Sequence, residues 1–264
     1  VARDEGDVDQ QGLDEAHLLR ENVADGVHML TRAYVNCYLI EDDDGVTLVD
    51  AGLPRMWFAL REALETVGYG VEDVKALVLT HGHFDHVGFA ARVQRQWQVP
   101  VYVHHDDASL AAHPYSYTPQ RNRFVYPLLH PRSLPIIGSM AVGGALRVKG
   151  VSGVERFGSQ DTLAVPGRPI ALHTPGHTRG HCMFYLPDRD VMLTGDALVT
   201  LDPYTGVSGP QIVASAATQD TREAIASLNL LEQHAATTLL PGHGEPWFDG
   251  TPAALEHAQA VGRH

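Results

Sequence analysis

Four short polar motifs in this chain share one arrangement, in which each motif begins where an apolar, strand-like run ends. Loops at strand ends are where open α/β architectures place their ligands. Glycine or proline beside each motif lets the backbone turn sharply. The pattern predicts a fold that brings four distant loops to one edge of a β-sheet core. The motifs are residues 81–86, 175–177, 196 and 243, and the runs before them are 77–80, 171–174, 192–195 and 239–242.

The first motif, His81-Gly82-His83-Phe84-Asp85-His86, is the most specific of the four. It places four potential metal ligands between a predicted buried strand and a predicted helix. Imidazole and carboxylate groups crowded there are costly to bury unless a divalent cation compensates them. His81 and His83, two residues apart in an extended loop, can reach one metal ion together, whereas Asp85 and His86 point elsewhere. The motif therefore predicts a metal site.

The hydrophobic pattern predicts interspersed strands and helices, and hence an α/β fold. Strand-like runs lie at 34–40, 46–49, 76–79, 101–103, 170–172, 183–186, 191–193 and 237–240. Predicted helices run from Pro54 to Gly68, over 87–97, over about 221–234 after a capping-box Asp220, and from Thr251 as N-cap. We expect residues 42–45 to form a hairpin turn, and the first two dozen residues to form an irregular or edge segment.

The length of 264 residues suits a single domain spanning 1–264. From about residue 104 to residue 165 the regular pattern stops, because five prolines interrupt any long helix. Such a stretch often has a function in a compact domain. We interpret it as an insertion that forms either a lid or pocket wall, or a helical segment packed on the body.

On these motifs the chain resembles the metallo-β-lactamase fold superfamily, whose signature is His-x-His-x-Asp-His followed by separated His, Asp and His. The resemblance runs from about Tyr34 to His243 and implies a four-layer αββα sandwich with metal ions at one edge. It also implies a ligand set for two ions. The first ion would be held by His81, His83 and His177, the second by Asp85, His86 and His243, and Asp196 would bridge them.

The same resemblance implies a hydrolytic mechanism. Two ions so held bind a shared water and lower its pKa until hydroxide is available near neutral pH. That bridging hydroxide attacks a carbonyl carbon, and Asp85 carries a proton to the leaving group. Nitrogen and oxygen ligands without thiolate suit Zn²⁺, while Fe, Mn and Co remain open.

Further polar residues near the motifs receive weaker roles. Asp50, in an Asp-x-Gly that matches the superfamily, is expected to orient a ligand histidine from behind, or else only to form a turn. The resemblance gives His181, four residues after His177, one of two roles. It either supports a metal ligand without binding the metal, or it is purely structural. His104 and His105 are expected to be structural.

Differences from the better-known subfamilies limit the reactions that we expect this site to catalyse. Metallo-β-lactamases proper lack the bridging aspartate, so Asp196 favours the branch that contains glyoxalase II and the lactonases. Glyoxalase II and the related persulfide dioxygenases carry a Gly-Cys-Gly-Arg-like segment soon afterwards, which residues 197–204 do not match. Acyl-homoserine lactonases have a tyrosine where Val199 stands. That Tyr204 takes over its role is a conjecture. We expect hydrolysis of a carbonyl ester, lactone or thioester, without a match to one subfamily.

An oxidoreductase is the main alternative. A mono-iron dioxygenase uses three ligands, and His81, His177 and Asp196 are compatible with them. Flavodiiron proteins are disfavoured because they have glutamate where His83 stands. A non-catalytic binding protein is a third hypothesis, disfavoured because such relatives usually lose ligands.

Charge and composition limit the partners. The formal net charge of −13 disfavours nucleic acid, which needs basic side chains to displace counterions. No apolar run approaches the roughly 20 residues that span a bilayer, and the polar start lacks the order of a secretion signal, so no membrane partner is expected. Cys37 and Cys182 do not suggest a disulfide framework. The expectation is a cytoplasmic enzyme with a small-molecule substrate.

Overall fold

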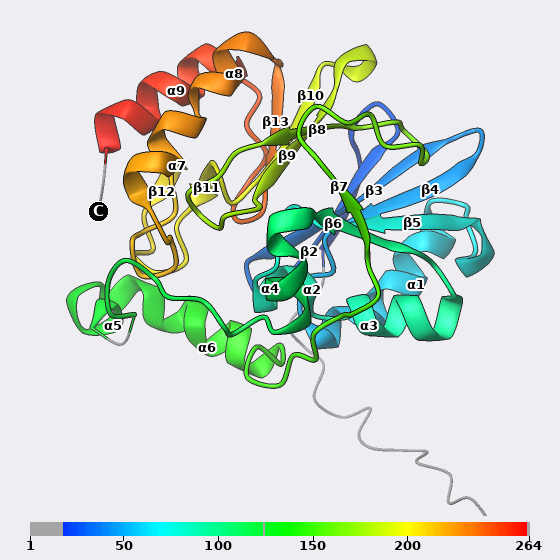
Figure 1. Ribbon diagram of the computed structural model, residues 1–264, viewed down its shortest axis with the longest axis horizontal. Coiled ribbons are helices and arrows are strands. Elements are labelled where there is room, and N and C mark those ends of the chain that lie inside the picture. Colours follow the sequence, from blue (N-terminus) through cyan, green and yellow to red (C-terminus); the bar gives the residue numbers. More distant parts are fainter. Residues whose placement is uncertain (1–17, 124, 263–264) are drawn as a thin grey trace, which may run out of the picture.

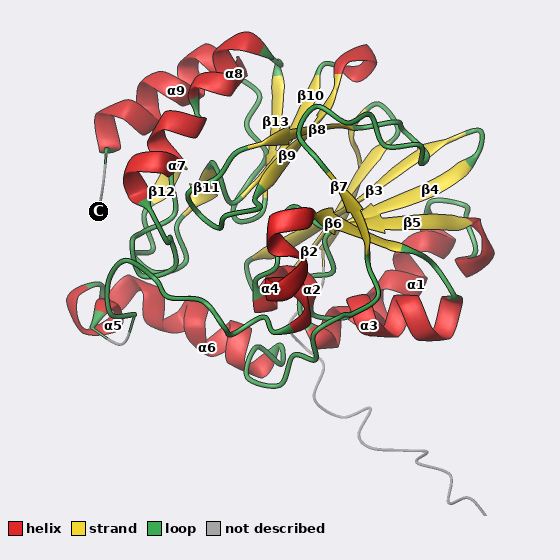
Figure 2. Cartoon of the chain, viewed as in Figure 1, coloured by secondary structure: helices red, strands yellow, loops and turns green. Residues whose placement is uncertain are grey.

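The computed structural model describes residues 18–123 and 125–262, which form two facing β-sheets with helices on their outer sides (Figure 1, Figure 2). The larger sheet has its seven strands in sequence order. Neighbours from β1 to β4 are antiparallel, and neighbours from β4 to β7 are parallel. These strands are β1 (Leu18–Ala24), β2 (Val27–Arg32), β3 (Val35–Asp42), β4 (Gly45–Val49), β5 (Val74–Val78), β6 (Val101–His104) and β7 (Glu155–Phe157).

The second sheet has the strand order β13–β10–β9–β8. Its β10 and β13 are parallel, and its other neighbours are antiparallel. A short antiparallel pair, β11 and β12, lies beside it. The strands are β8 (Ile170–His173), β9 (Cys182–Leu186), β10 (Val191–Gly195), β11 (Val199–Leu201), β12 (Ser208–Gln211) and β13 (Thr238–Pro241).

Helices lie on the outer faces and in the insertion. A 3₁₀ turn at Pro54–Met56 leads into α1, and a π-helical turn at Val93–Trp97 follows α3. The helices are α1 (Trp57–Thr66), α2 (Phe84–Val87), α3 (Ala90–Arg92), α4 (Ala108–Ala112), α5 (Tyr126–Leu129), α6 (Leu134–Val142), α7 (Thr221–Ser227), α8 (Asn229–Gln233) and α9 (Gly250–Val261). Within the described part of the chain, no helix is long and apolar enough to cross a membrane.

The three largest apolar cores show that the architecture has four layers. Successive side chains of a strand point to opposite faces, and here both faces are buried. Leu77 of β5 packs in the core that includes Leu60 of α1, whereas the next residue, Val78, packs between the sheets. In β9, Phe184 packs between the sheets and Met183 packs in the core that includes the α7–α9 helices. The αββα sandwich that the resemblance implied is confirmed.

Backbone hydrogen bonds join the loops that leave the two sheets at one edge. The amide of Cys182 donates to the carbonyl of Thr80, which ties the second sheet to the loop after β5. Within the second sheet, the amide of Gly242 donates to the carbonyl of Gly195. The amide of Asn36, in β3, donates to the Gly242 carbonyl. The loops after β5, β10 and β13 are therefore fixed next to one another.

Each of the eight predicted strand runs overlaps an observed strand. The helix after Pro54 and the hairpin turn between β3 and β4 are also confirmed. Strand β2 was not predicted, because its residues are buried on both faces and show no polar alternation. The expected edge segment is confirmed for β1, and residues 1–17 lie outside the described residues.

Two predicted helices are interrupted for identifiable reasons. The prediction for 87–97 is confirmed over 90–97, where α3 and the π-helical turn lie, but its start is wrong. The amides of Gly88 and Phe89 donate to carbonyls of the loop after β4 and not to a preceding helical turn. A Cβ at Gly88 would lie 2.1 Å from the Gly52 carbonyl oxygen, so this contact requires glycine. The predicted helix 221–234 divides at Leu228, whose amide makes a tight turn by donating to the Ile225 carbonyl.

One of the two predicted N-cap residues is confirmed and the other is wrong. Asp220 accepts hydrogen bonds from the amides of Arg222 and Glu223, so it caps α7 as predicted. The prediction of Thr251 as N-cap is wrong, because α9 begins at Gly250. The Thr251 hydroxyl instead bonds the backbone of Ala236, which attaches α9 to the loop before β13.

The core between the sheets should dominate the stability of the fold. Phe184 is fully buried there, so Phe184→Ala should lower the free energy of unfolding by about 3–5 kcal/mol through lost burial and a cavity. Leu128 is 83% exposed, and Leu128→Ala should change it by less than about 0.5 kcal/mol. Urea unfolding in the presence of a chelator measures both values without a contribution from metal binding. Equal losses would contradict this assignment of the core.

Candidate metal centre

All seven predicted ligand residues lie together and buried where the strand-end loops meet. Asp85 and His86 project from α2, and the other five from the loops themselves. Within each group that the residues form, one ligand atom per residue lies within 4.8 Å of the others. The groups are His81 with His83 and His177, His81 with His86 and Asp196, and Asp85 with His86 and His243.

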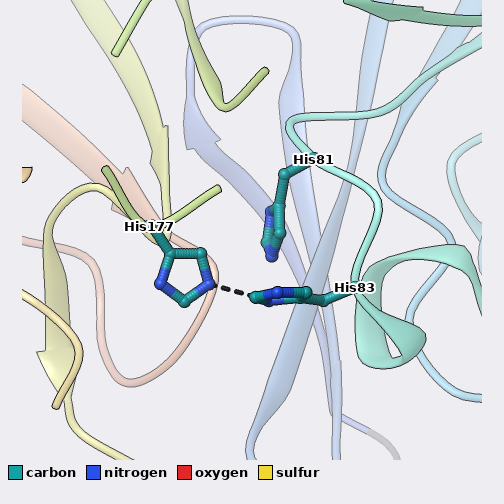
Figure 3. A group of neighbouring side chains, drawn as sticks. All are labelled: His81, His83 and His177. Atoms are coloured by element: carbon teal, nitrogen blue, oxygen red, sulfur yellow. Dashed lines mark hydrogen bonds between the residues drawn. The ribbon is translucent and has the colours of Figure 1, made fainter. Parts of the chain in front are cut away.

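The first group points its rings toward one another (Figure 3). Nδ1 of His83 lies 2.9 Å from Nε2 of His177. The ring of His81 approaches both others edge-on, with centroid separations of 4.7 Å to His83 and 4.8 Å to His177. Three imidazoles that share one volume in this way can supply the three protein ligands of a tetrahedral ion.

Asp196 lies between the two halves of the ligand set. Its Oδ2 is 3.4 Å from Nε2 of His177 in the first group and 3.4 Å from Nε2 of His243 in the other. Its Oδ1 is 3.4 Å from Nε2 of His86. The Oδ2 of Asp85 is also 3.4 Å from Nε2 of His243. One carboxylate therefore reaches ligand atoms on both sides, as a bridging ligand must.

The hydrogen bonding of the ligand atoms also fits a metal ion. Nε2 of His81, His86 and His243 and Oδ1 of Asp196 are buried and have no hydrogen-bond partner among the described residues. Each orphaned polar atom costs about 1–3 kcal/mol, so a cluster of them needs compensation. Coordination to a cation supplies it, and imidazole with carboxylate suits Zn²⁺, Fe or Mn.

In every ligand histidine except His83, the ring nitrogen that faces away from the cluster has a hydrogen-bond partner. Nδ1 of His86 lies 2.8 Å from the Asp50 carboxylate, and Nδ1 of His243 lies 2.7 Å from the Tyr34 carbonyl. Threonine hydroxyls lie 3.0 Å from Nδ1 of His81 and 3.2 Å from Nδ1 of His177. A ring that donates from Nδ1 presents the Nε2 lone pair to a metal, so these contacts orient the ligands.

Asp50 combines the two roles that its motif left open. It has a left-handed backbone, with φ of 62°, at the turn after β4. Its Oδ1 accepts from the Thr80 amide, and its Oδ2 lies within hydrogen-bond distance of both the Thr80 hydroxyl and His86. The turn thus places a carboxylate behind α2 and beside the residue that precedes the His81 loop.

His181 contacts the backbone of Asp196. Its Nε2 accepts the Asp196 amide at 2.9 Å, which leaves the ring proton on Nδ1 to be donated to the Thr174 hydroxyl at 2.8 Å. Burial lowers the pKa of His181 well below its usual value, which keeps this ring neutral. Gly242 completes the arrangement, because a Cβ there would lie 2.2 Å from Oδ1 of Asp196.

Asp107 is a buried carboxylate that sequence reasoning missed. Its Oδ2 accepts from the Gly82 amide and the Thr178 hydroxyl, and its Oδ1 accepts from the Gly180 amide. Burial raises the pKa of this carboxyl, which these hydrogen bonds oppose. Asp107 therefore ties the His81 loop to the His177 loop. A lone aspartate after a strand carries no local signal of such a role.

Asn36 was also missed and holds the His243 loop. Its side-chain amide donates to the carbonyls of Pro241 and Gly244, and the Tyr38 hydroxyl donates to Pro241 as well. By contrast, His104 and His105 lie outside the ligand cluster. The ring of His104 stacks on His173 with a centroid separation of 4.1 Å, and its Nδ1 accepts the Asp106 amide.

Without a metal ion, the charges of the ligand residues balance one another. Burial lowers the pKa of His81 and His83 well below the usual value, and that of His177 to about 4. Burial also opposes charge on His86 and His243, but the carboxylate of Asp196 raises both, His243 to about 10. Burial tends to raise the pKa of Asp196, yet these rings hold it well below its usual range. Metal binding must displace such protons.

Comparison with known proteins gives a consistent picture. The family model described as the metallo-beta-lactamase superfamily matches residues 30–243. The probable metallo-hydrolase YflN of Bacillus subtilis is 30% identical over 236 residues, which cover 84% of this chain and 85% of that protein.

Solved structures agree with this match. The metallo-beta-lactamase family protein TTHA1429 of Thermus thermophilus superposes with a TM-score of 0.65 at 25% identity, covering 90% of this chain and 78% of that one. TTHA1623, solved in a di-iron-bound form, superposes with a TM-score of 0.56 at 25% identity, covering 86% and 94%.

Asp107 should affect metal binding without touching a metal. Asp107→Ala removes the acceptors that join the two ligand loops, so the affinity for Zn²⁺ should fall about 10–100-fold. Asp188→Ala removes the same charge from an exposed residue that belongs to no group of potential metal ligands, and should change the affinity less than about twofold. Competition against a chromogenic chelator measures both. Equal losses would show that Asp107 acts only through its charge.

Proposed function

Because the chain belongs to the metallo-beta-lactamase superfamily, we propose that it is a metal-dependent hydrolase of carbonyl esters, lactones or thioesters with a two-ion site. The observation that carries this proposal is the position of Asp196 between two sets of buried ligand atoms. His81, His83 and His177 would hold one ion, Asp85, His86 and His243 the other, and Asp196 both. Two divalent ions, of which Zn²⁺ suits these ligands best, supply a nucleophilic water at neutral pH.

We propose Asp85 as the residue that moves the proton. Its carboxylate is buried in the ligand cluster, with Oδ2 3.4 Å from Nε2 of His243. Hydrolysis adds the oxygen of water to the carbonyl carbon, breaks the bond to the leaving oxygen or sulfur, and moves one proton from the water to that atom. An ionised carboxylate beside the attacking water can accept this proton and return it to the leaving group.

The insertion contacts both halves of the fold next to this site. On one side, the Gly143 carbonyl after α6 accepts the amide of Arg55. On the other, the amides of Gln120 and Arg121 donate to the Thr218 and Ser215 carbonyls. Figure 1 shows α5 and α6 running along the edge where the two sheets' loops meet. These contacts support the interpretation of residues 104–165 as a pocket wall.

An apolar cavity under the insertion, next to the helix that carries the ligand Asp85, supports an apolar substrate portion. Its volume is about 360 Å³, enough for a short acyl or aryl group. Phe84, directly before Asp85, forms one side of it. Most of the other lining comes from the insertion, including Tyr115, Ile137, Met140, Ala141 and Leu146.

The partners follow from charge and redox state. A small molecule is the proposed substrate, since the net charge of −13 disfavours nucleic acid. Cys37 and Cys182 are both free and buried, which supports a reducing, cytoplasmic location.

A mono-iron dioxygenase remains the second candidate, because Asp196 groups with His81 and also lies 3.4 Å from His177. The di-iron form of TTHA1623 supports iron on a related fold, although with two ions. Two zinc ions per chain with ester turnover favour the hydrolase. One iron per chain with oxygen consumption favours the dioxygenase.

Removal of the ions should abolish hydrolysis of aryl esters and lactones, and added Zn²⁺ should restore it. Asp196→Asn should lower kcat about 100-fold or more, because one bridging carboxylate is lost. Asp188→Asn makes the same change on an exposed residue and should leave kcat unaltered. Initial rates and elemental analysis of each protein measure these effects. Full activity in folded Asp196→Asn protein rules out the two-ion mechanism.

A bulkier side chain in the cavity should shift the preference toward esters with shorter acyl chains. Ala141→Phe places a ring into the cavity and should raise KM for hexanoate esters about tenfold, with little effect on acetate esters. Val142→Phe adds the same ring at the next position of α6, which does not line the cavity, and should alter neither KM. A uniform change across chain lengths would contradict an acyl-binding role.

A further inference from the structure

A stack of three side chains leads from a metal ligand into the insertion. The ring of Tyr117 lies on the ring of His83 with a centroid separation of 4.0 Å. The guanidinium of Arg123 lies over the same tyrosine ring, with Cζ 4.6 Å from the ring centroid. Stacking covers the faces of a guanidinium and leaves its N–H edge available for a planar anion. Arg123 is thus one aromatic layer away from the ligand cluster.

Arg123 is a charged side chain at an apolar cavity. Among the residues that line the apolar cavity it is the one charged side chain. No ion pair joins it to a carboxylate in the described parts of the chain. Asp85 is near enough to influence Tyr117 and Tyr204, but its oxygen belongs to the second ligand group. A half-buried guanidinium beside an apolar surface is costly unless an anion pairs with it.

Two tyrosine hydroxyls lie beside the guanidinium. The Tyr117 hydroxyl is buried and makes no well-aligned hydrogen bond among the described residues, although the Tyr204 hydroxyl and the Arg123 guanidinium lie beside it. A phenol is protonated at neutral pH, so both hydroxyls can donate to an anion.

The stack stands between two cavities of opposite character. Arg123 and Tyr204 line the apolar cavity. Tyr117 lines a polar cavity of about 640 Å³ that also reaches Gly176 and Thr178, on either side of the ligand His177. A substrate that crosses the metal ligands therefore meets an apolar wall on one side and polar groups on the other.

We propose that Arg123, with Tyr117 and Tyr204, binds a carboxylate on the leaving group of the substrate, while the apolar acyl chain occupies the cavity beside α6. This rests on the proposed hydrolase function and names its substrate class: esters of a short apolar acid with a hydroxy acid. One guanidinium neutralises one negative charge, which favours a carboxylate over a doubly charged phosphate. The fork of the guanidinium also matches the two oxygens of a carboxylate.

The test uses metal-loaded protein and two esters, phenyl hexanoate and 3-carboxyphenyl hexanoate. Their leaving groups are similar in basicity and differ in one carboxylate. The measured quantity is the ratio of kcat/KM for the charged ester to that for the neutral one. Arg123→Gln should lower this ratio about tenfold relative to the unaltered protein, and Arg123→Lys should retain part of it. Comparing ratios cancels the general repulsion from the acidic protein.

Arg121→Gln is the matched control, because it removes the same charge from an exposed residue in the same segment. It should leave the ratio unchanged. An equal ratio in the unaltered protein and Arg123→Gln, or an equal drop in Arg121→Gln, overturns the carboxylate subsite while the hydrolase function stands. Failure of the metal-loaded protein to hydrolyse either ester would instead overturn the hydrolase function itself. Unchanged thermal unfolding of the variants shows that the comparison concerns binding and not folding.

Discussion

Burial of many polar ligand atoms in one small volume is the constraint on which the rest of this structure depends. Five imidazoles and two carboxylates meet at the edge of the sheets, and several of their nitrogen and oxygen atoms have no partner in the described chain. Such a cluster is stable only if charge compensates charge. In the chain alone, protons on His86 and His243 balance Asp196. A divalent cation can take over that balance and satisfy the orphaned atoms together, so metal binding and the ordering of the loops are coupled.

The loops are held by side chains that bond backbone groups across the molecule, and not by the ligands alone. Asp107 joins the His81 and His177 loops, and Asn36 holds the His243 loop from β3. Asp50 accepts from Thr80 while orienting His86. Each of these groups accepts or donates at least two hydrogen bonds, so the chain itself helps to hold the ligands in position for an ion. Preorganisation of this kind lowers the cost of binding and fixes which nitrogen of each ring faces the ion.

Chemistry and specificity come from different parts of the chain. The ligands belong to strand ends of the two sheets, whereas most of the apolar cavity, Tyr117 and Arg123 belong to the insertion. The insertion contacts both halves of the fold, so its conformation depends on the body that it covers. This division is the usual one for folds that support many reactions, because loops can change without disturbing the scaffold. It explains why the motif points to hydrolysis but leaves the substrate open.

What the sequence determined by itself is local. The spacing of His81, His83, Asp85 and His86, the apolar run before each motif and the proline after β4 are readable within a few residues, and so are most strands. Tertiary structure decided the contacts made across long separations. Asp107 meets Thr178, 71 residues away, and Gly88 breaks a periodic helix because its amide bonds the loop after β4. Arg123 reaches the His83 ring through Tyr117 only because the insertion folds back over the ligands. Periodicity records which face of an element is buried, but a hydrogen bond or stack between distant loops depends on how the sheets pack, and it leaves no local pattern.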